Sequence, residues 1–364
     1  MKQKKILIIG AGISGLALAI NLQRMKIPYR IIEKQFSWEK KGLAMSIQGE
    51  GLKAASSLGI LEEIKKQSRK RDLCRIENSK GTILKNIPIN LNNTSFVIRR
   101  DVIHQALRSR IKKIEMGINV NNISEKSDTI KILFSDKSTD TFNMIIGADG
   151  INSKTMGYVT GYNKTTKINP AEYSGSALWG FTLPKFFKEI IEVWESKKMF
   201  AMYPVDKGTV FSFFMNVPEN FYSQKKERKK YLQKHFSSFS NNIIKEVLQT
   251  LPDNIFFDKI KYSRPDHWSK GKVTLIGDAC HSLSPLSGLG ANLAMADAEG
   301  LAKIINMSKN NEDLLNRLNF FNSERKVEAD KAYLLSKLRT NRSMLNFPGN
   351  IIRNRKMKSA GWTY

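Results

Sequence analysis

The chain has 364 residues, of which 41% are hydrophobic and 9% aromatic, a composition too apolar for a disordered protein. Its two cysteines, Cys74 and Cys280, form no Cys-x-x-Cys or Cys/His cluster, which argues against a disulfide framework and a structural zinc site. The formal net charge of +27 comes from basic residues spread along the chain without a nucleic-acid motif, so we expect no nucleic-acid partner.

The N-terminus has the outline of a signal peptide, because a basic start precedes the apolar residues 6–20. Gly10, Gly12 and Gly15 interrupt this stretch, and no small-residue cleavage motif follows it. We therefore interpret the segment as a strand, a turn and a helix. No later segment reaches the roughly 18 uninterrupted apolar residues of a membrane span. We expect a cytoplasmic protein without a transmembrane segment.

Hydrophobic periodicity predicts an opening βαβ unit, with strands at 5–9 and 29–33 around a helix at 14–25. Longer alternating segments with a turn at 206–208 indicate an antiparallel sheet between residues 171 and 217. Further helices are predicted at 51–66 (with an interruption at Gly59), 100–114, 225–239, 241–250, 290–307 and 312–338. Further strands are predicted at 73–77, 82–84, 95–98, 120–124, 130–134, 142–146 and 272–276.

These elements predict an α/β fold in which a Rossmann-like nucleotide-binding lobe is interrupted by an antiparallel-sheet lobe and then resumed. We place the first part of the nucleotide-binding lobe at residues 1–170 and the sheet at 171–265. The lobe resumes, with C-terminal helices, at 266–340. Residues 341–364 are predicted to be a basic tail that packs loosely.

The first motif that carries chemistry is G-A-G-I-S-G at residues 10–15, between the first strand and the first helix. Gly10 permits the tight turn, Gly12 lets a pyrophosphate approach the backbone, and Gly15 lets the helix pack on the strand. Glu33 ends the second strand, where a carboxylate can accept hydrogen bonds from ribose hydroxyls. The motif predicts dinucleotide binding but does not distinguish NAD from FAD.

Two later segments also follow predicted strands: G-A-D-G-I-N-S at 147–153 and G-D-A-C-H-S-L-S-P-L-S-G-L-G-A-N at 277–292. With the opening motif they resemble, in order and approximate spacing, the GxGxxG, GADG and GDAAH…P…GxGxN segments of the para-hydroxybenzoate-hydroxylase-like FAD monooxygenases. The resemblance covers the chain from residue 6 to about 338. It implies that the protein binds FAD, that NAD(P)H is a transient reductant, and that molecular oxygen hydroxylates an aromatic or polycyclic substrate through a flavin C4a-hydroperoxide.

The resemblance also implies the cofactor contacts. Asp278, at a strand end, would accept hydrogen bonds from the ribityl hydroxyls, and the backbone from Pro285 to Gly290 would approach the flavin ring. Arg100 matches the family's FAD-contacting arginine, and Arg99 is the alternative if the register differs by one. The expected cofactor-binding residues are Gly10, Gly12, Ile13, Ser14, Gly15, Glu33, Lys34, Arg100, Asp149, Asp278, Pro285, Gly288, Gly290, Ala291 and Asn292.

Each of these assignments has a structural alternative. Asp278 could instead cap a helix, and Asp149 could be a simple turn residue. We expect no catalytic side chain and no metal ligand, and we interpret His281 as structural and Cys280 as a small apolar side chain. The predicted sheet carries a cluster of apolar side chains: Met199, Phe200, Met202, Phe211, Phe213, Phe214 and Met215. Core packing is the default interpretation of this cluster, although in the family one face of the sheet lines the substrate pocket.

The sequence departs from the family at two places. The loop after Glu33 offers Lys40 and Lys41 where an arginine is usual, and Thr155 and Met156 replace a valine–arginine pair. Both departures bear on NAD(P)H binding more than on FAD binding. The substrate does not follow from the sequence, and phenols, quinolones and polyketide-like polycycles all stay open. Residues 284–288 also show a weak similarity, over five residues, to tetracycline-inactivating members of the family.

Two other functions remain open. One is a flavin-dependent reductase or halogenase of the same fold, although the halogenase W-x-W-x-I-P signature is missing from the sequence. The other is a non-catalytic scaffold that holds FAD. Neither the choice between NADH and NADPH nor the oligomeric state follows from the sequence.

Overall fold

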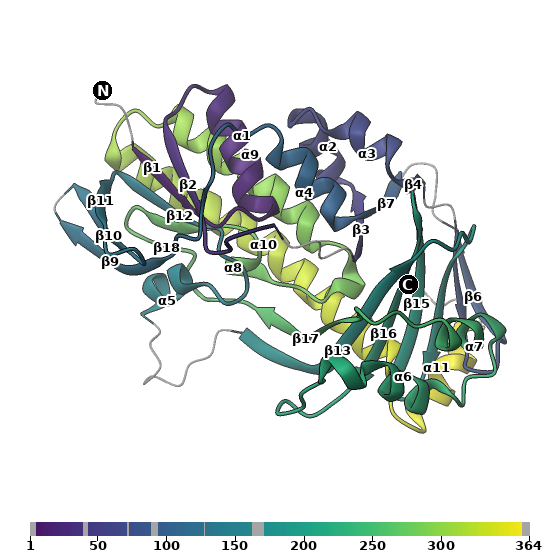
Figure 1. The fold of residues 1–364 in the computed structure, drawn as a ribbon. Helices are drawn as coiled ribbons and strands as arrows, with labels where there is room; N and C mark the ends of the chain where they lie inside the picture. Colours follow the sequence, from purple (N-terminus) through teal and green to yellow (C-terminus); the bar gives the residue numbers. More distant parts are fainter. Residues whose placement is uncertain are drawn as a thin grey trace.

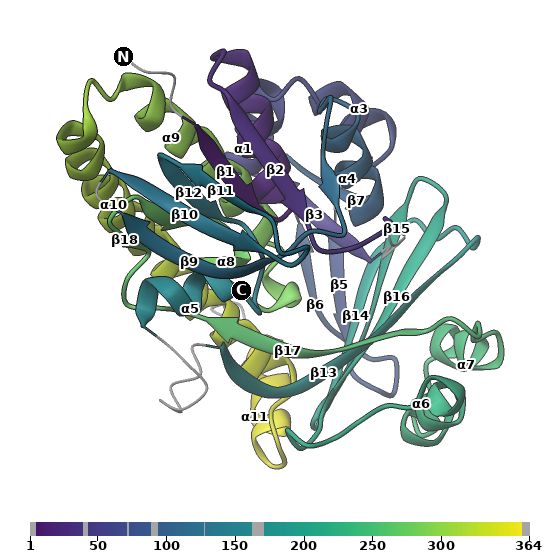
Figure 2. The ribbon, with the colours of Figure 1, turned by 60° about the vertical axis from the view of Figure 1, so that its left-hand side comes forward.

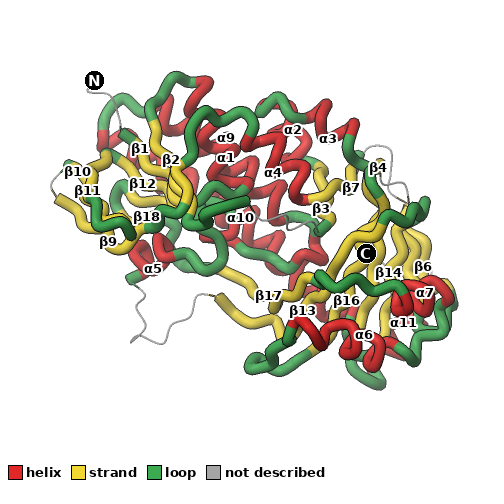
Figure 3. The backbone as a smooth tube through the Cα atoms, in the orientation of Figure 1, coloured by secondary structure: helices red, strands yellow, loops and turns green. Residues whose placement is uncertain are grey.

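A computed structural model describes residues 5–38, 43–70, 73–88, 94–126, 128–161 and 171–358 of the protein. Lys40 and Lys41, together with residues 359–364 of the expected basic tail, lie outside the described residues. The chain forms two lobes, one of helices around a parallel sheet and one dominated by long strands (Figure 3). The predicted α/β class is confirmed. No helix within the described ranges is long and apolar enough to cross a membrane.

The first lobe is built on a sheet whose strands come from distant parts of the chain. In chain order, its described strands are β1 (Ile6–Ile9), β2 (Tyr29–Glu33), β8 (Glu115–Met116), β12 (Met144–Gly147), β18 (Ser269–Lys270) and β19 (Val273–Leu275). Their spatial order is β18-β19-β12-β1-β2-β8, and only the β18–β19 pair is antiparallel. Strand β1 is completely buried, as expected of a central parallel strand covered on both faces.

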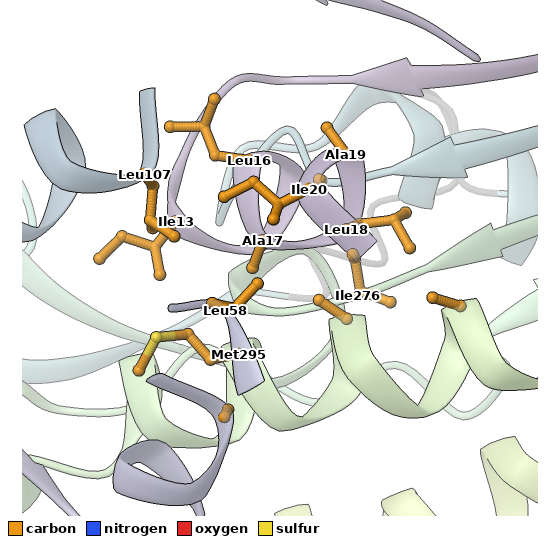
Figure 4. Packing of buried hydrophobic residues seen from close by; sticks show 14 of the residues in the cluster. Ile13, Leu16, Ala17, Leu18, Ala19, Ile20, Leu58, Leu107, Ile276 and Met295 are labelled. Atoms are coloured by element: carbon orange, nitrogen blue, oxygen red, sulfur yellow. The ribbon is translucent and has the colours of Figure 1, made fainter. Parts of the chain in front are cut away.

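Helices cover this sheet and form the largest core. The helix α1 (Ile13–Arg24) packs against α9 (Gly290–Met307), and Figure 4 shows side chains of α1 meeting Met295 and Ile276. Three more helices complete this layer: α2 (Glu50–Ser57), α3 (Leu61–Lys66) and α4 (Arg100–Arg108). The predicted interruption at Gly59 is confirmed, since this residue has a φ of +72° between α2 and α3.

The helix predicted at 100–114 ends early, at Arg108. The side chain of Arg110 folds back and donates hydrogen bonds to the carbonyls of Ala106 and Gly59 at 2.6 and 2.8 Å, which satisfies backbone groups at the helix end. The apolar residues that follow continue the hydrophobic pattern without continuing the helix. The prediction was therefore wrong at its C-terminal boundary.

Two small sheets flank the first lobe. One joins β3 (Ala44–Gln48), β4 (Arg69–Lys70) and β7 (Ser95–Arg99), and it lies between the helices and the second lobe. The other joins β9 (Val120–Lys126), β10 (Thr129–Phe134) and β11 (Thr139–Phe142), next to the helix α5 (Lys154–Thr160) (Figure 1). The strand predicted at 142–146 is thus divided between β11 and β12.

The second lobe is a large, mostly antiparallel sheet in the order β17-β13-β16-β15-β14-β5-β6. Five of its described strands are β13 (Ala171–Leu183), β14 (Ile190–Glu195), β15 (Lys198–Val205), β16 (Gly208–Asn216) and β17 (Phe256–Ser263). The other two, β5 (Leu73–Glu77) and β6 (Ile83–Pro88), belong to residues that the predicted boundaries assign to the nucleotide-binding lobe. The second lobe therefore recruits strands from both sides of residue 171. Figure 2 shows β13 and β17 reaching from this sheet back to the first lobe.

The two faces of the large sheet bury different parts of the predicted apolar cluster. Five of its members pack against α6 (Arg228–Phe236) and α7 (Asn242–Gln249): Phe200, Met202, Phe211, Phe213 and Met215. Met199 and Phe214 point to the opposite face, which looks toward the first lobe, and pack with Leu286. This division follows from the period of two in a strand.

The C-terminal part of the chain ties the lobes together. Helix α10 (Asn311–Ser343) extends past the predicted end at residue 338 and runs from the first lobe to the second (Figure 1). Helix α11 (Gly349–Met357) follows, with Met357 completely buried and Arg353 5% exposed. Arg353 donates hydrogen bonds to the carbonyls of Arg342 and Ser343, both at 2.9 Å. The expectation of a loosely packed tail was therefore wrong up to residue 358.

Candidate functional site

In the loop between β1 and α1, two glycines lie too close to the backbone for a side chain, and a third faces open space. Gly10 has a φ of +103°, and a Cβ there would lie 2.4 Å from the carbonyl oxygen of Ala148. A Cβ on Gly15 would lie 2.0 Å from the carbonyl oxygen of Gly10. A Cβ on Gly12, by contrast, would meet no described atom within 4 Å. Gly10 and Gly15 thus serve backbone packing, whereas Gly12 leaves an open approach to the N-terminus of α1.

Glu33 marks one end of a cavity of about 460 Å³, which we call the first cavity. The backbone N–H groups of Ala11 and Gln35 donate to the two oxygens of the Glu33 carboxylate at 2.9 and 3.0 Å. His104 lies opposite and donates from Nε2 to the carbonyl of Ala11 at 2.9 Å. Burial lowers the pKa of His104, so its imidazole is neutral at pH 7. The cavity is lined by Ala11, Gly12, Glu33, Gln35, Ser37, Trp38, Arg100, Asp101, His104, Gln105 and Arg108.

A second cavity, of about 260 Å³, shares Gly12 and Arg100 with the first. Asp278 begins the short helix α8 (Asp278–His281) and lines this cavity. The hypothetical Cβ of Gly290, at the start of α9, would lie 3.8 Å from Oδ1 of Asp278. Nine of the predicted cofactor-binding residues line the second cavity: Gly12, Ile13, Ser14, Arg100, Asp278, Pro285, Gly288, Gly290 and Ala291. Counting Glu33 in the first cavity, ten of the fifteen predicted residues line these two adjoining cavities.

Of the two neighbouring arginines, Arg100 lines the cavities and Arg99 does not. The Arg99 side chain lies near two carboxylates, with Nε at 3.3 Å from Asp101 and 3.9 Å from Asp206. Arg100 lines both cavities, and its backbone N–H donates to the carbonyl of Leu43 at 2.9 Å. A cation therefore stands where the two cavities meet.

Three predicted residues outside the glycine loop do not line either cavity. Lys34 is exposed. Asp149 accepts hydrogen bonds within its own turn from Ser153, Lys154 and Thr155, the first at 2.5 Å, so the turn alternative describes its contacts. Asn292 is 4% exposed. Its side-chain amide donates to the carbonyls of Ser46 and Gly288 and accepts from the N–H of Gln48. The bonds with Ser46 and Gln48 join α9 to β3, and the bond with Gly288 joins it to the loop before α9.

His281 lies in a buried network behind the second cavity. Its Nε2 contacts Asp297, and Arg325 donates from Nε to the same carboxylate at 2.8 Å. Burial alone would lower the pKa of His281, but the Asp297 carboxylate raises it well above the usual value. Burial raises the pKa of the adjacent Cys280 thiol to about 11. Both residues lie off the cavities, in keeping with their structural interpretation.

A third cavity, of about 60 Å³, lies between the loop 285–288 and the large sheet. It shares five lining residues with the second cavity: Leu43, Ala44, Met45, Pro285 and Gly288. The remaining lining residues are Ser46, Val97, Leu178, Tyr203, Ser212, Phe214, Leu286, Ser287 and Arg339. Motif reasoning missed Tyr203, Ser212 and Arg339, because no local pattern distinguishes them from other sheet and helix residues.

The arrangement fits FAD. A bound FAD needs a ribose acceptor, bare backbone at the pyrophosphate, an acceptor for the ribityl chain and space for the flavin ring. Glu33, Gly12, Asp278 and the loop 285–290 supply these features in three adjoining cavities. The N-terminal ends of α1 and α9 both open into it, and Arg100 adds a cation for the phosphates.

Comparison with known proteins identifies the family. The sequence model described as "FAD binding domain" matches residues 3–334. A "Flavin-dependent monooxygenase" from an unknown prokaryotic organism is 29% identical over 322 residues, covering 83% of this chain and 80% of the relative. The 2-heptyl-3-hydroxy-4(1H)-quinolone synthase of Pseudomonas aeruginosa is 24% identical over 328 residues, covering 85% of this chain and 83% of that enzyme.

Solved structures share the fold. Klebsiella pneumoniae HpxO complexed with FAD and uric acid has a TM-score of 0.87 at 19% identity, with 98% of this chain and 93% of that chain covered. The tetracycline destructase Tet(51) has a TM-score of 0.74 at 23% identity, with 98% and 95% covered. This chain therefore belongs to the FAD-binding-domain family and, within it, to the flavin-dependent monooxygenases that resemble para-hydroxybenzoate hydroxylase.

Proposed function

We propose that the protein is an NAD(P)H-driven FAD monooxygenase that hydroxylates an aromatic or enolic small molecule with molecular oxygen. The observation that supports this proposal is that the three cavities adjoin one another. The first and second share Gly12 and Arg100, and the second and third share Pro285 and Gly288. A cofactor extended along the first two cavities would present its reactive end to the third. FAD, when bound, supplies the redox centre and the site of oxygen activation.

The protein side chains bind and orient the cofactor in this proposal. Glu33 accepts hydrogen bonds from the ribose hydroxyls, and the N-terminus of α1 at Gly12 faces the pyrophosphate. Arg100 neutralises phosphate charge, and Asp278 holds the ribityl chain. The N-terminal end of α9 directs its N–H groups toward the ring edge where negative charge accumulates on reduction.

The third cavity would bind the substrate. Its wall combines apolar side chains such as Met45, Leu178 and Phe214 with polar ones in about equal measure, a combination that can both enclose a ring and orient its polar groups. A substrate bound there would displace water from the flavin and so limit wasteful release of hydrogen peroxide. Relatives of similar sequence and fold are named for quinolone, urate and salicylate substrates, which supports a ring substrate for this chain.

The cellular setting is also a proposal. The cysteines Cys74 and Cys280 are free and buried, which fits the reducing cytoplasm.

The deciding experiment follows the flavin. Anaerobic mixing of the FAD-loaded protein with NADPH or NADH should bleach the flavin absorbance, slowly without a substrate and faster with one. In air, a substrate should lower peroxide release while hydroxylated product appears by mass spectrometry. A protein that holds FAD but is reduced by neither nucleotide would be a scaffold. Reduction without any compound from a phenol, quinolone and polyketide panel changing the rate or the peroxide yield would favour a reductase.

A further inference from the structure

Large apolar side chains are concentrated on the surface near the C-terminus. Among the described residues, fourteen large apolar side chains are exposed, and six of them lie within residues 334–352. Their exposed fractions range from 41% to 73%. We call this set the C-terminal patch: Leu334, Leu335 and Leu338 of α10, then Phe347, and Ile351 and Ile352 of α11. A gathering of exposed apolar side chains marks a contact with a partner or a membrane.

The two helices that carry the patch are neighbours, because α11 folds back against the end of α10. The guanidinium of Arg353 donates to the carbonyls of Arg342 and Ser343, both at 2.9 Å. Leu334 and Leu338 are about one turn apart on α10, and about 14 Å of helix separates Leu334 from Ser343. Figure 2 shows α11 at the lower margin of the molecule, where a large partner can reach it.

Helix α11 divides its side chains between the protein and the solvent. Arg353 and Met357 lie four residues apart on one face, and both are buried. Ile351, Arg355 and Lys358 follow one another at intervals of four and three residues, so they share the opposite face, and all three are exposed. Because the solvent face of a surface helix is ordinarily polar, the folding of this chain does not account for the isoleucine there.

The same part of the chain is strongly basic. Residues 331–364 contain eight lysines and arginines and no aspartate or glutamate. Carboxylates from other parts of the fold pair with some of these cations, as Glu172 does with Lys337 and Glu192 with Arg339. Arg355 extends into solvent beside the isoleucines of α11. The C-terminal patch therefore combines exposed apolar side chains with positive charge.

This combination decides which kind of partner fits. A second copy of the chain in a symmetric contact would bring each cation of the patch near its own counterpart, and like charges repel. A nucleic acid would match the charge but would leave the apolar side chains without a contact. The boundary of an anionic bilayer fits both features, because its acyl region accepts apolar side chains and its headgroups attract lysine and arginine.

We propose that the C-terminal patch binds the surface of a membrane that contains anionic phospholipids. The leucines of α10 and the isoleucines of α11 enter the boundary between headgroups and acyl chains, while Arg355 and Lys358 contact the lipid phosphates. None of the six patch residues lines the first, second or third cavity. The inference therefore concerns a separate surface and goes beyond the proposed reaction.

Co-sedimentation of the FAD-loaded protein with vesicles tests the proposal. The vesicles consist of phosphatidylcholine alone or of phosphatidylcholine mixed with phosphatidylglycerol. The protein should sediment with the anionic vesicles only, and less of it should do so as the salt concentration is raised. Two double variants separate the contributions, since Ile351→Ser/Ile352→Ser removes apolar surface and Arg355→Gln/Lys358→Gln removes charge. Each should lower the partition coefficient by about tenfold or more.

A matched control tests whether any two cations would serve. Lys112 and Lys113 are exposed and follow α4 in the first lobe, and α4 lies in the upper part of Figures 1 and 2, whereas α11 lies in the lower part. Because distant charges are screened by salt, Lys112→Gln/Lys113→Gln should change the partition coefficient by less than about twofold. Flavin content and melting temperature report whether each variant is folded, and the substituted side chains are all exposed.

Three results would overturn the proposal. The first is a parent protein that does not sediment with the anionic vesicles. The second is either patch variant binding these vesicles as well as the parent does. The third is an equal loss of binding in Lys112→Gln/Lys113→Gln, which would show attraction by net charge alone.

A second copy of the chain as the true partner would give a different pattern. Analytical ultracentrifugation would then show a dimer that Ile351→Ser/Ile352→Ser dissociates, while the parent would not bind vesicles, and the proposal would be wrong. None of these measurements uses NAD(P)H or oxygen, so a failure here is distinct from a failure of the proposed function, which would show as missing flavin reduction.

Discussion

Replacement of Asp278 by alanine should weaken FAD binding without destabilising the apoprotein. The Asp278 side chain is exposed, lines the second cavity and forms no hydrogen bond to the described part of the chain. Its proposed partners are the ribityl hydroxyls alone. Because a charge-assisted hydrogen bond contributes about 1.5–3 kcal/mol, the Kd for FAD should rise by about 10- to 150-fold. Titration of apoprotein with FAD, followed by flavin fluorescence, measures this change.

Asp149→Ala is the matched control, because Asp149 lies in the corresponding turn after β12 but accepts hydrogen bonds from Ser153, Lys154 and Thr155. Its removal leaves buried donors unsatisfied and should lower the melting temperature of the apoprotein. Asp278→Ala should leave that temperature unchanged. The placement of the ribityl site is wrong if Asp278→Ala retains FAD within twofold of the parent, or if its apoprotein melts as early as that of Asp149→Ala.

Three further predictions concern folding and cofactor access. Gly12→Ala should fold normally but bind FAD at least roughly tenfold more weakly. Gly15→Ala should lose about 1–3 kcal/mol or more of stability, because its Cβ would lie 2.0 Å from a backbone oxygen. Equal melting temperatures of the two apoproteins would contradict this expectation. The raised pKa of His281 means that its protonation stabilises the fold fully below about pH 6.5, the usual value, and that this stabilisation is lost as pH rises through the folded pKa. Urea titrations should therefore show that His281→Gln lowers the unfolding free energy more at pH 6 than at pH 9. If the loss is the same at both pH values, the contact between His281 and Asp297 is not an ion pair. Arg353→Ala should destabilise the protein by about 2–3 kcal/mol, because two hydrogen bonds to the end of α10 are lost, while substitution of an exposed arginine of α11 should have no measurable effect in the same titration.

Sequence reasoning was most successful where function depends on a few consecutive residues. The turn at residues 10–15, the carboxylate of Glu33 and the loop 285–290 all follow buried strands or precede helices, and the structure brings them to two adjoining cavities. Parallel strands end at the same edge of a sheet, so motifs at their ends converge whatever lies between them. Asn292 and Asp149 belong to the same motifs, but their side chains accept hydrogen bonds from nearby backbone groups, so their predicted cofactor contacts stay predictions.

Boundaries and long-range pairings were less accessible. Strands β5 and β6 read as isolated short strands, yet they complete the large sheet through the parallel pairing of β5 with β14. The helix after Arg100 ends where Arg110 folds back onto backbone carbonyls, a contact that hydrophobic periodicity does not encode. Helix α11 packs stably because Arg353 and Met357 are buried against parts of the chain more than 100 residues away. The guanidinium of Arg353, for example, lies over the ring of Trp194.

The sequence by itself determined the dinucleotide site, because glycine spacing, strand ends and helix starts are local features with local causes. Only the tertiary structure decided which side chains line the third cavity beside that site. Arg339 and Glu192 are 147 residues apart and belong to a helix and a strand with no motif of their own. They form an ion pair only because α10 crosses from one lobe to the other and brings a cation to a buried carboxylate that needs a partner.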